Sequence, residues 1–119
     1  MSNIQDSLKD ALTIDGSLVV AVVDAKSGML LGSEGSGVDI ELAAAGNTEV
    51  VRAKLATMKS LKLNDVIEDI LITLGKQYHV IRPIAKLNNI FLYFVLDKAK
   101  ANLALARRKL QEIEAAIEI

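Results

Sequence analysis

The sequence predicts a mixed α/β (α+β) fold, a five-stranded antiparallel sheet with helices on both faces. Two runs, Leu18–Val23 and Ile90–Leu96, are apolar without alternation. A strand covered on both faces needs such a run, whereas a strand with one face in water alternates. Short turns at 25–28 and 75–76 connect successive strands, and connections this short join antiparallel strands. The elements therefore follow the order α-β-β-α-β-β-β-α.

The ends of the predicted elements come from capping residues, glycines and a proline. Ser2 and Gln5 have capping-box spacing, and Asp39 and Asp97 each precede a helical pattern. Pro83 lacks an N–H, so it is expected near a strand end, at a bulge or on an unpaired side. The predicted elements are helix 3–13, strand 17–24, strand 29–33, loop 32–37, helix 40–59, strands 65–74, 77–84 and 90–96, and helix 98–117.

Composition limits the size of the fold and the kinds of partner. The length of 119 residues predicts one domain, 1–119. The formal net charge of −1 provides no field that would attract nucleic acid or an anionic membrane. No apolar run approaches the ~20 residues that cross a bilayer, so membrane insertion is not expected. The absence of cysteine excludes disulfides and permits a reducing compartment, so the expected location is the cytoplasm.

No motif predicts catalysis, a cofactor or a metal site. The glycine-rich stretch 32–37 lacks the Gly-Lys-Ser/Thr ending of a phosphate-binding P-loop. His79 is the only histidine, so a site with several histidine ligands cannot form. Glu68 and Asp69 are neighbours in a predicted strand and point to opposite faces, which prevents joint acid–base action. The sequence therefore predicts a protein that is not an enzyme and holds no cofactor.

The helix predicted at 40–59 has small or apolar side chains on two sides. A helix packed against one sheet needs a single apolar stripe. The second side therefore either packs against another chain or is buried inside the domain. One side carries Leu42, Ala43, Gly46, Val50, Ala53 and Thr57, and the adjacent side carries Ala44, Thr48, Val51, Leu55 and Met58.

Four stretches of the chain can be compared with a known family. They are Gly-Ser-Leu-Val-Val-Ala-Val-Val-Asp-Ala-Lys-Ser-Gly-Met-Leu-Leu-Gly at 16–32, the small-residue helix 40–59, Ile-Phe-Leu-Tyr-Phe-Val-Leu-Asp at 90–97, and Asn-Leu-Ala-Leu-Ala-Arg at 102–107. Together they resemble the roadblock (dynein light-chain roadblock) family, in particular its prokaryotic members. The resemblance covers almost the whole chain and implies a profilin-like, roadblock architecture.

The resemblance also implies a homodimer in which the third strands of two chains pair and the second helices pack together. An edge position for strand 65–74 agrees with this, because charges in mid-strand favour an edge that is protected or paired. The residues assigned to self-association are Ala43, Gly46, Val50, Ala53 and Thr57 on the helix, and Ile67, Glu68, Asp69 and Ile70 on the strand.

Members of this family act as scaffolds or regulators of small Ras-like GTPases, and some are subunits of motor or signalling assemblies. The resemblance therefore implies a non-enzymatic homodimeric regulator or scaffold that binds such a GTPase and biases its nucleotide state. Two alternatives remain open. One is a structural subunit of a larger complex without a GTPase partner. The other is a small-ligand sensor with a pocket near Tyr78, His79 or Tyr93.

Overall fold

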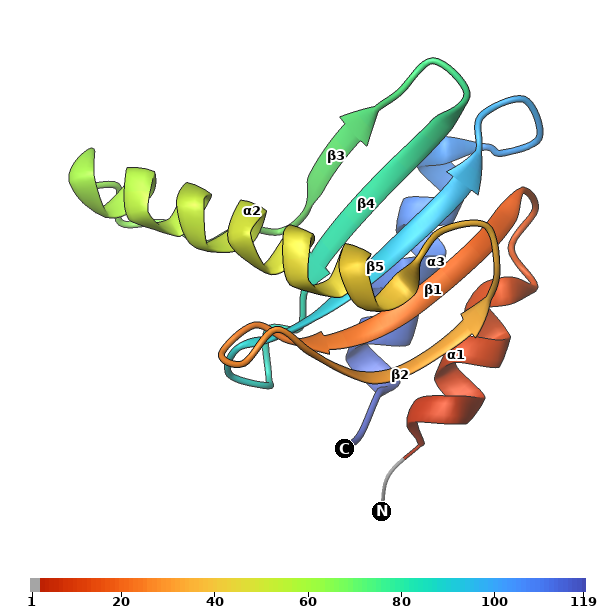
Figure 1. The fold of residues 1–119 in the computed structure, drawn as a ribbon, viewed down its shortest axis with the longest axis horizontal. Helices are drawn as coiled ribbons and strands as arrows, with labels where there is room; N and C mark the ends of the chain where they lie inside the picture. The colour runs from red at the N-terminus through yellow and green to blue at the C-terminus, as the bar shows by residue number, and fades with distance from the viewer. Residues whose placement is uncertain (1–2) are drawn as a thin grey trace.

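Residues 3–119, described here by a computed structural model, form a five-stranded sheet with helices on both faces (Figure 1). The strand order is β2-β1-β5-β4-β3, and each neighbouring pair runs antiparallel. The predicted fold class and order of elements are confirmed. The elements are α1 (Ile4–Leu12), β1 (Ser17–Asp24), β2 (Met29–Gly35), α2 (Ile40–Ser60), β3 (Ile70–Thr73), β4 (Gln77–Pro83), β5 (Ile90–Asp97) and α3 (Leu103–Ala116).

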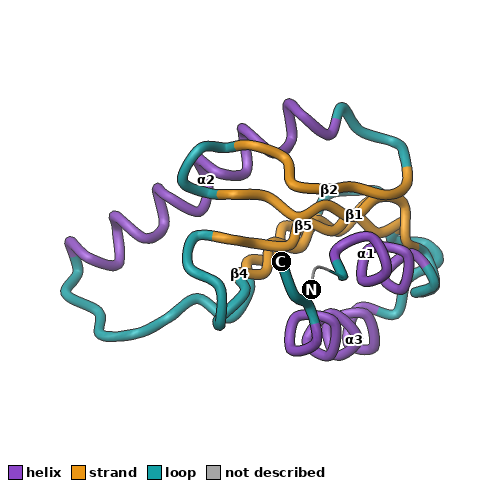
Figure 2. The backbone as a smooth tube through the Cα atoms, turned by 90° about the horizontal axis from the view of Figure 1, so that it is seen from below, coloured by secondary structure: helices purple, strands orange, loops and turns teal. Residues whose placement is uncertain are grey.

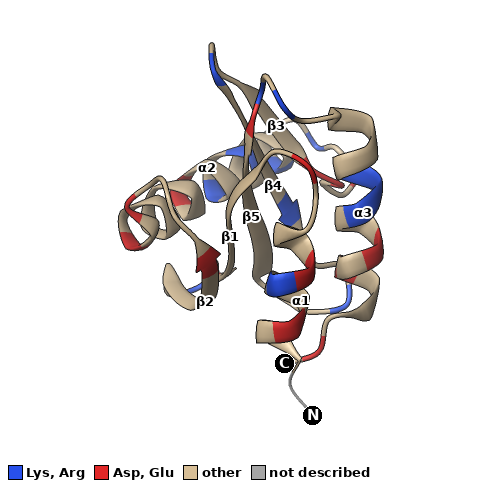
Figure 3. Ribbon diagram, turned by 90° about the vertical axis from the view of Figure 1, so that its right-hand side faces the viewer, with Lys and Arg blue, Asp and Glu red and all other residues tan. Residues whose placement is uncertain are grey.

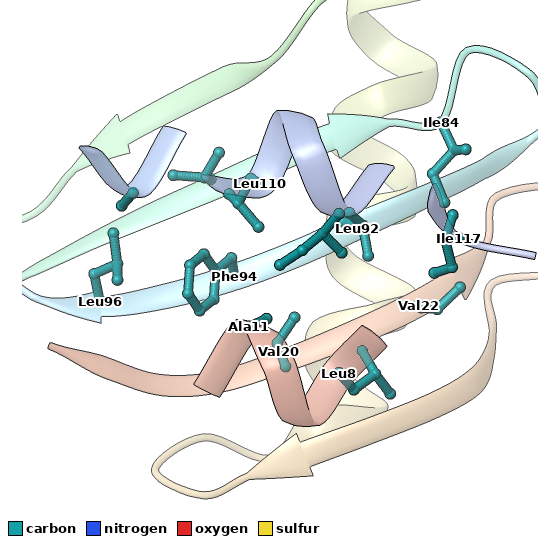
Figure 4. Close-up of a cluster of buried hydrophobic side chains, with 13 residues drawn as sticks. Leu8, Ala11, Val20, Val22, Ile84, Leu92, Phe94, Leu96, Leu110 and Ile117 are labelled. Carbon is teal, nitrogen blue, oxygen red and sulfur yellow. The ribbon is translucent and has the colours of Figure 1, made fainter. Parts of the chain in front are cut away.

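The two unbroken apolar runs form the neighbouring strands β1 and β5 inside the sheet. Their alternate side chains face opposite layers, with α1 and α3 on one side and α2 on the other (Figure 2). Beneath α1 and α3 lies a cluster of Leu8, Ala11, Val20, Val22, Val80, Ile84, Leu92, Phe94, Leu96, Ala106, Leu110, Ile113 and Ile117 (Figure 4). Beneath α2 lies a cluster of Val19, Ala21, Val23, Ala44, Val51, Ile81, Phe91, Tyr93 and Val95.

The caps of two helices can be compared with the sequence. Asp39 caps α2 as predicted, because its Oδ1 accepts the N–H of Leu42 at 3.2 Å. The capping box predicted for α1 includes Ser2, which lies outside the described residues. Its second member, Gln5, donates a side-chain hydrogen bond to Glu34 on β2 at 2.9 Å.

The start of the last helix was predicted wrongly. Asp97 does not cap a helix, because its Oδ1 accepts the N–H of Ala99 at 3.0 Å and closes a turn. The cap is Asn102, whose Oδ1 accepts the N–H of Leu105 at 3.1 Å. α3 therefore begins at Leu103, five residues after the predicted start at 98.

Two strands also differ from their predicted lengths. β2 continues to Gly35, which pairs with Val19, so the glycine-rich loop is shorter than predicted. β3 lies at the sheet edge as predicted, but its ladder contains residues 70–73 and not 65–74. Residues 64–69 precede this ladder and belong to no strand. Pro83 is the last residue of β4, near a strand end as expected.

The C-terminal half of α2 projects beyond the sheet (Figures 1 and 2). The first half packs on the sheet through Ala44, Thr48 and Val51, all of which are buried. On the projecting half and the segment that follows it, Leu55, Leu61, Leu63 and Val66 are exposed. A single copy of the chain therefore leaves a large apolar surface in contact with water.

Candidate functional site

Most of the small-residue stripe on α2 faces away from the sheet, although Ala43 packs against the cluster beneath the helix. Of the five residues predicted there, Ala43 is half-buried, and Gly46, Val50, Ala53 and Thr57 are exposed. A methyl group added at Gly46 would meet no atom within 4 Å. The adjacent side, with Ala44, Thr48 and Val51, is the side that packs on the sheet. Within one chain the stripe is therefore open from Gly46 to Thr57, and burial inside the domain does not explain the composition of that part.

The predicted edge residues lie at the start of β3 and in the segment before it. Ile67 and Ile70 are half-buried and Glu68 is exposed. The Asp69 carboxylate is directed into the protein, since its side chain is only 7% exposed. This residue contributes backbone to the edge, while its charge serves contacts within the chain.

A groove of about 520 Å³ brings the two predicted surfaces together. Val50 from the helix and Ile67, Glu68, Asp69 and Ile70 from the edge all line this groove. The remaining helix residues of the predicted set, Ala43, Gly46, Ala53 and Thr57, do not line it. They extend the same face of α2 beyond the groove.

Five of the groove-lining residues were not assigned to this surface from the sequence: Lys54, Met58, Leu63, Asp65 and Val66. Exposed Leu61 and Leu63 follow the end of α2, where a polar turn is the usual pattern. Two leucines so soon after the helix are the sequence signal that could have identified the apolar surface at this end of α2. The apolar surface at this end of α2 is therefore larger than predicted.

A network of charged side chains connects the start of β3 to β4 and α3, on which acidic and basic residues are interspersed (Figure 3). Arg107 donates to both oxygens of Asp69, at 2.7 and 2.8 Å. Arg82 Nε donates to Glu114 at 2.6 Å, and its Nη1 lies 3.8 Å from Asp69. Glu114 also accepts the backbone N–H of Ala85 at 3.1 Å. The network fixes the position of the backbone at Asp69, directly before the edge strand β3.

His79 and Tyr93 form a second polar group, on the α2 side of the sheet. The Tyr93 hydroxyl lies 2.9 Å from His79 Nδ1, and Gln77 Oε1 lies 2.9 Å from His79 Nε2. Burial lowers the pKa of His79. Burial raises the pKa of Tyr93, and a hydrogen bond from Asn47 opposes that shift. A neutral imidazole that donates from Nε2 and accepts at Nδ1 satisfies both neighbours.

The three rings expected near a ligand pocket lie on both sides of the sheet. Tyr78 packs with the cluster under α1 and α3, whereas Tyr93 packs under α2, so the three rings do not converge. Among residues 3–119, no three His, Asp or Glu side chains are grouped so that they could hold a metal ion. None of the helices formed by these residues combines the length and apolar character that crossing a bilayer requires.

Comparison with known proteins gives a clear result for structure and none for sequence. No protein-family model and no curated protein matches the sequence. Myxococcus xanthus MglB matches with a TM-score of 0.75 and 20% identity over 92% of this chain and 84% of that chain. A Roadblock/LC7 domain from Streptomyces avermitilis matches with a TM-score of 0.81 and 7% identity over 92% and 90%.

A third structure, described as MglB with tetrameric arrangement, matches with a TM-score of 0.82 and 15% identity over 94% of this chain and 82% of that chain. These likenesses extend over nearly the whole of the described chain. The chain therefore has the Roadblock/LC7 fold, as the resemblance of its sequence implied.

Proposed function

We propose that this chain is a homodimeric regulator or scaffold, not itself an enzyme, that binds a small Ras-like GTPase in the cytoplasm. The observation that carries the proposal is the groove in which Val50 on α2 meets Ile67–Ile70 at the free sheet edge. An open stripe of small residues continues along the same helix. A helix face and a sheet edge that are both unpaired, side by side, are features of an interaction surface.

A second copy of the chain fits this surface. Two identical edges related by a two-fold axis can pair antiparallel, so that one sheet continues into the next. Each copy would provide a pairing strand for the outer edge of β3 in the other. Each projecting half of α2 would then lie over the other copy. The fold likeness to an MglB described in a tetrameric arrangement supports self-association of this kind.

The GTPase partner rests on the fold and on the family resemblance, which associates roadblock domains with small Ras-like GTPases. A regulator without catalytic groups can act by binding one nucleotide state better than the other, which shifts the partner's population toward that state. No nucleotide site on this chain is needed for such a mechanism.

Self-association is tested by placing a bulky side chain on the stripe. Ala53→Trp is expected to reduce the mass in sedimentation equilibrium to that of one chain, because the indole fills the space that a second helix needs. Ala56→Trp is the matched control, since Ala56 is also exposed on α2 but lies outside the predicted set. If both variants keep the mass of the unmodified protein, the stripe is not the contact surface.

The GTPase is tested by affinity capture from the native source, with either GDP or a non-hydrolysable GTP analogue added. The regulator proposal expects a GTPase to be recovered with one nucleotide in preference to the other. Capture of a stable complex that contains no GTPase would favour the structural-subunit alternative instead.

A further inference from the structure

A second groove, of about 540 Å³, lies on the opposite rim of the segment 65–68. It shares these four residues with the groove described above, but it is formed against Val51 and Leu55 of α2. Its other walls are the end of β4, the turn at 87–89 and the start of β5. The predicted self-association residues on α2 do not line it.

This groove has an exposed apolar lining. Leu55 is 48% exposed and Val66 is 78% exposed, although both are aliphatic residues that are usually buried. Leu87 and Ile90 line the opposite side and are half-buried. Four apolar side chains around one hollow form a site that can take up an apolar group.

The groove is also negatively charged. Its lining contains three carboxylates, Asp65, Glu68 and Glu114, and one guanidinium, Arg82, which gives a net charge of −2. Arg82 is neutralised by Glu114 and Asp69. Within residues 3–119, Asp65 and Glu68 form no ion pair. Because the whole chain carries only −1, the groove is more negative than the molecule around it.

The buried charges next to the groove hold its walls in place. The side chains of Arg82 and Glu114 are each 13% exposed, and their 2.6 Å contact joins β4 to α3. Asp69, directly after the shared segment, is held by Arg107 from α3. A groove with fixed walls binds with less loss of conformational entropy than one that must form on contact.

We propose that this groove docks a short segment of a partner protein in which an aliphatic or aromatic side chain stands beside lysine or arginine. The apolar lining receives the apolar side chain, and the two unpaired acids attract the cation. An anionic membrane or a nucleic acid would be repelled by the same acids. The docking groove lies apart from the small-residue stripe on α2, but it shares Ile67 and Glu68 with the residues assigned to self-association. It does not depend on whether the partner is a GTPase.

The test is an NMR titration of the full isotope-labelled chain with two synthetic peptides, acetyl-Gly-Lys-Leu-Phe-Arg-Gly-amide and its counterpart with glutamate in place of lysine and arginine. The basic peptide is expected to shift the amide signals of Leu55, Val66 and Leu87. The acidic peptide is expected to bind at least about tenfold more weakly, since both of its charges are repelled.

A pair of variants isolates the contribution of the charges. D65N combined with E68Q is expected to weaken binding of the basic peptide by about fivefold to tenfold, the effect of two partly screened ion pairs. E112Q is the control, because Glu112 is an exposed acid on α3 outside the groove. Equal binding of both peptides, no shift at millimolar peptide, or shifts elsewhere on the chain would overturn the proposal.

Sedimentation of the same samples separates this proposal from the proposed function. Peptide binding to the groove is expected to leave the mass of the assembly unchanged. If the D65N and E68Q changes lower the mass while the peptides do not bind, then a second copy occupies the groove and the docking proposal fails. If the protein is a single chain that still binds the basic peptide, the docking proposal stands and self-association fails.

Discussion

Replacing Gly46 with alanine distinguishes a lone chain from an assembled pair. Gly46 lies inside α2, and a Cβ at this position meets no atom within 4 Å. Alanine in a helix interior is more favourable than glycine by about 0.5–1 kcal/mol, because glycine loses more backbone entropy on folding. With no steric cost to offset this gain, Gly46→Ala stabilises a single chain by the full amount. The melting temperature should rise by about 2–5 °C.

Gly46→Ala becomes destabilising instead of stabilising if a second helix lies on the stripe. A methyl group inserted into a close-packed contact costs about 1–3 kcal/mol, and a two-fold interface contains the substitution twice. The helix gain is then smaller than the packing loss. We expect the dissociation constant of the pair to rise by at least about tenfold, which corresponds to 1.4 kcal/mol.

The assay is urea unfolding followed by circular dichroism at about 1 µM and about 100 µM chain, because self-association makes stability depend on concentration. The variant should be more stable than the unmodified protein at the low concentration and less stable at the high one. Ala56→Gly is the control, and it is expected to lower the free energy of unfolding by the same amount at both concentrations. If Gly46→Ala stabilises equally at both concentrations, the stripe is uncovered in solution and the proposed interface is wrong.

Three further predictions can be measured by urea unfolding. Arg82→Met leaves the buried Glu114 carboxylate without its cation and should cost about 3 kcal/mol, whereas Lys109→Met, in an exposed pair, should cost less than about 1 kcal/mol. Burial lowers the pKa of His79 below the ordinary 6.5, so the unfolded chain takes up the proton first and stability falls as pH drops below 6.5. His79→Gln should remove that part of the pH dependence. Tyr93→Phe deletes the hydroxyl beside His79 and should cost about 1 kcal/mol.

The centre of the sheet could be predicted because its signals are local. Leu18–Val23 and Ile90–Leu96 are long enough, and uniform enough, to require cover on both faces, and they lie next to each other in the sheet. The inner side of α2 follows helical spacing, and Asp39 stands directly before it and caps it. In each case the residues that decide the structure are close together in sequence.

Features that depend on distant residues could not be predicted. Asp97 and Asn102 are both good capping residues, and the turn that engages Asp97 forms only beside the β3–β4 hairpin, where the Lys98 N–H donates to Lys76. Arg107 and Asp69 are 38 residues apart, and no local pattern pairs them. The charged network and the second groove therefore emerge only from the folded chain.

The outer edge of β3 is not protected by charge in the way that the sequence predicted. Charges in mid-strand were expected to protect strand 65–74, yet the Asp69 carboxylate is buried against arginines and Glu68 precedes the ladder. The strand that remains, Ile70–Thr73, carries no charge, no proline and no lysine. An uncharged, aliphatic edge strand has unpaired N–H and C=O groups that can pair with another strand. Because charge does not protect this edge, we propose that a second strand covers it, and the identical edge of another copy is the candidate that the proposed dimer supplies.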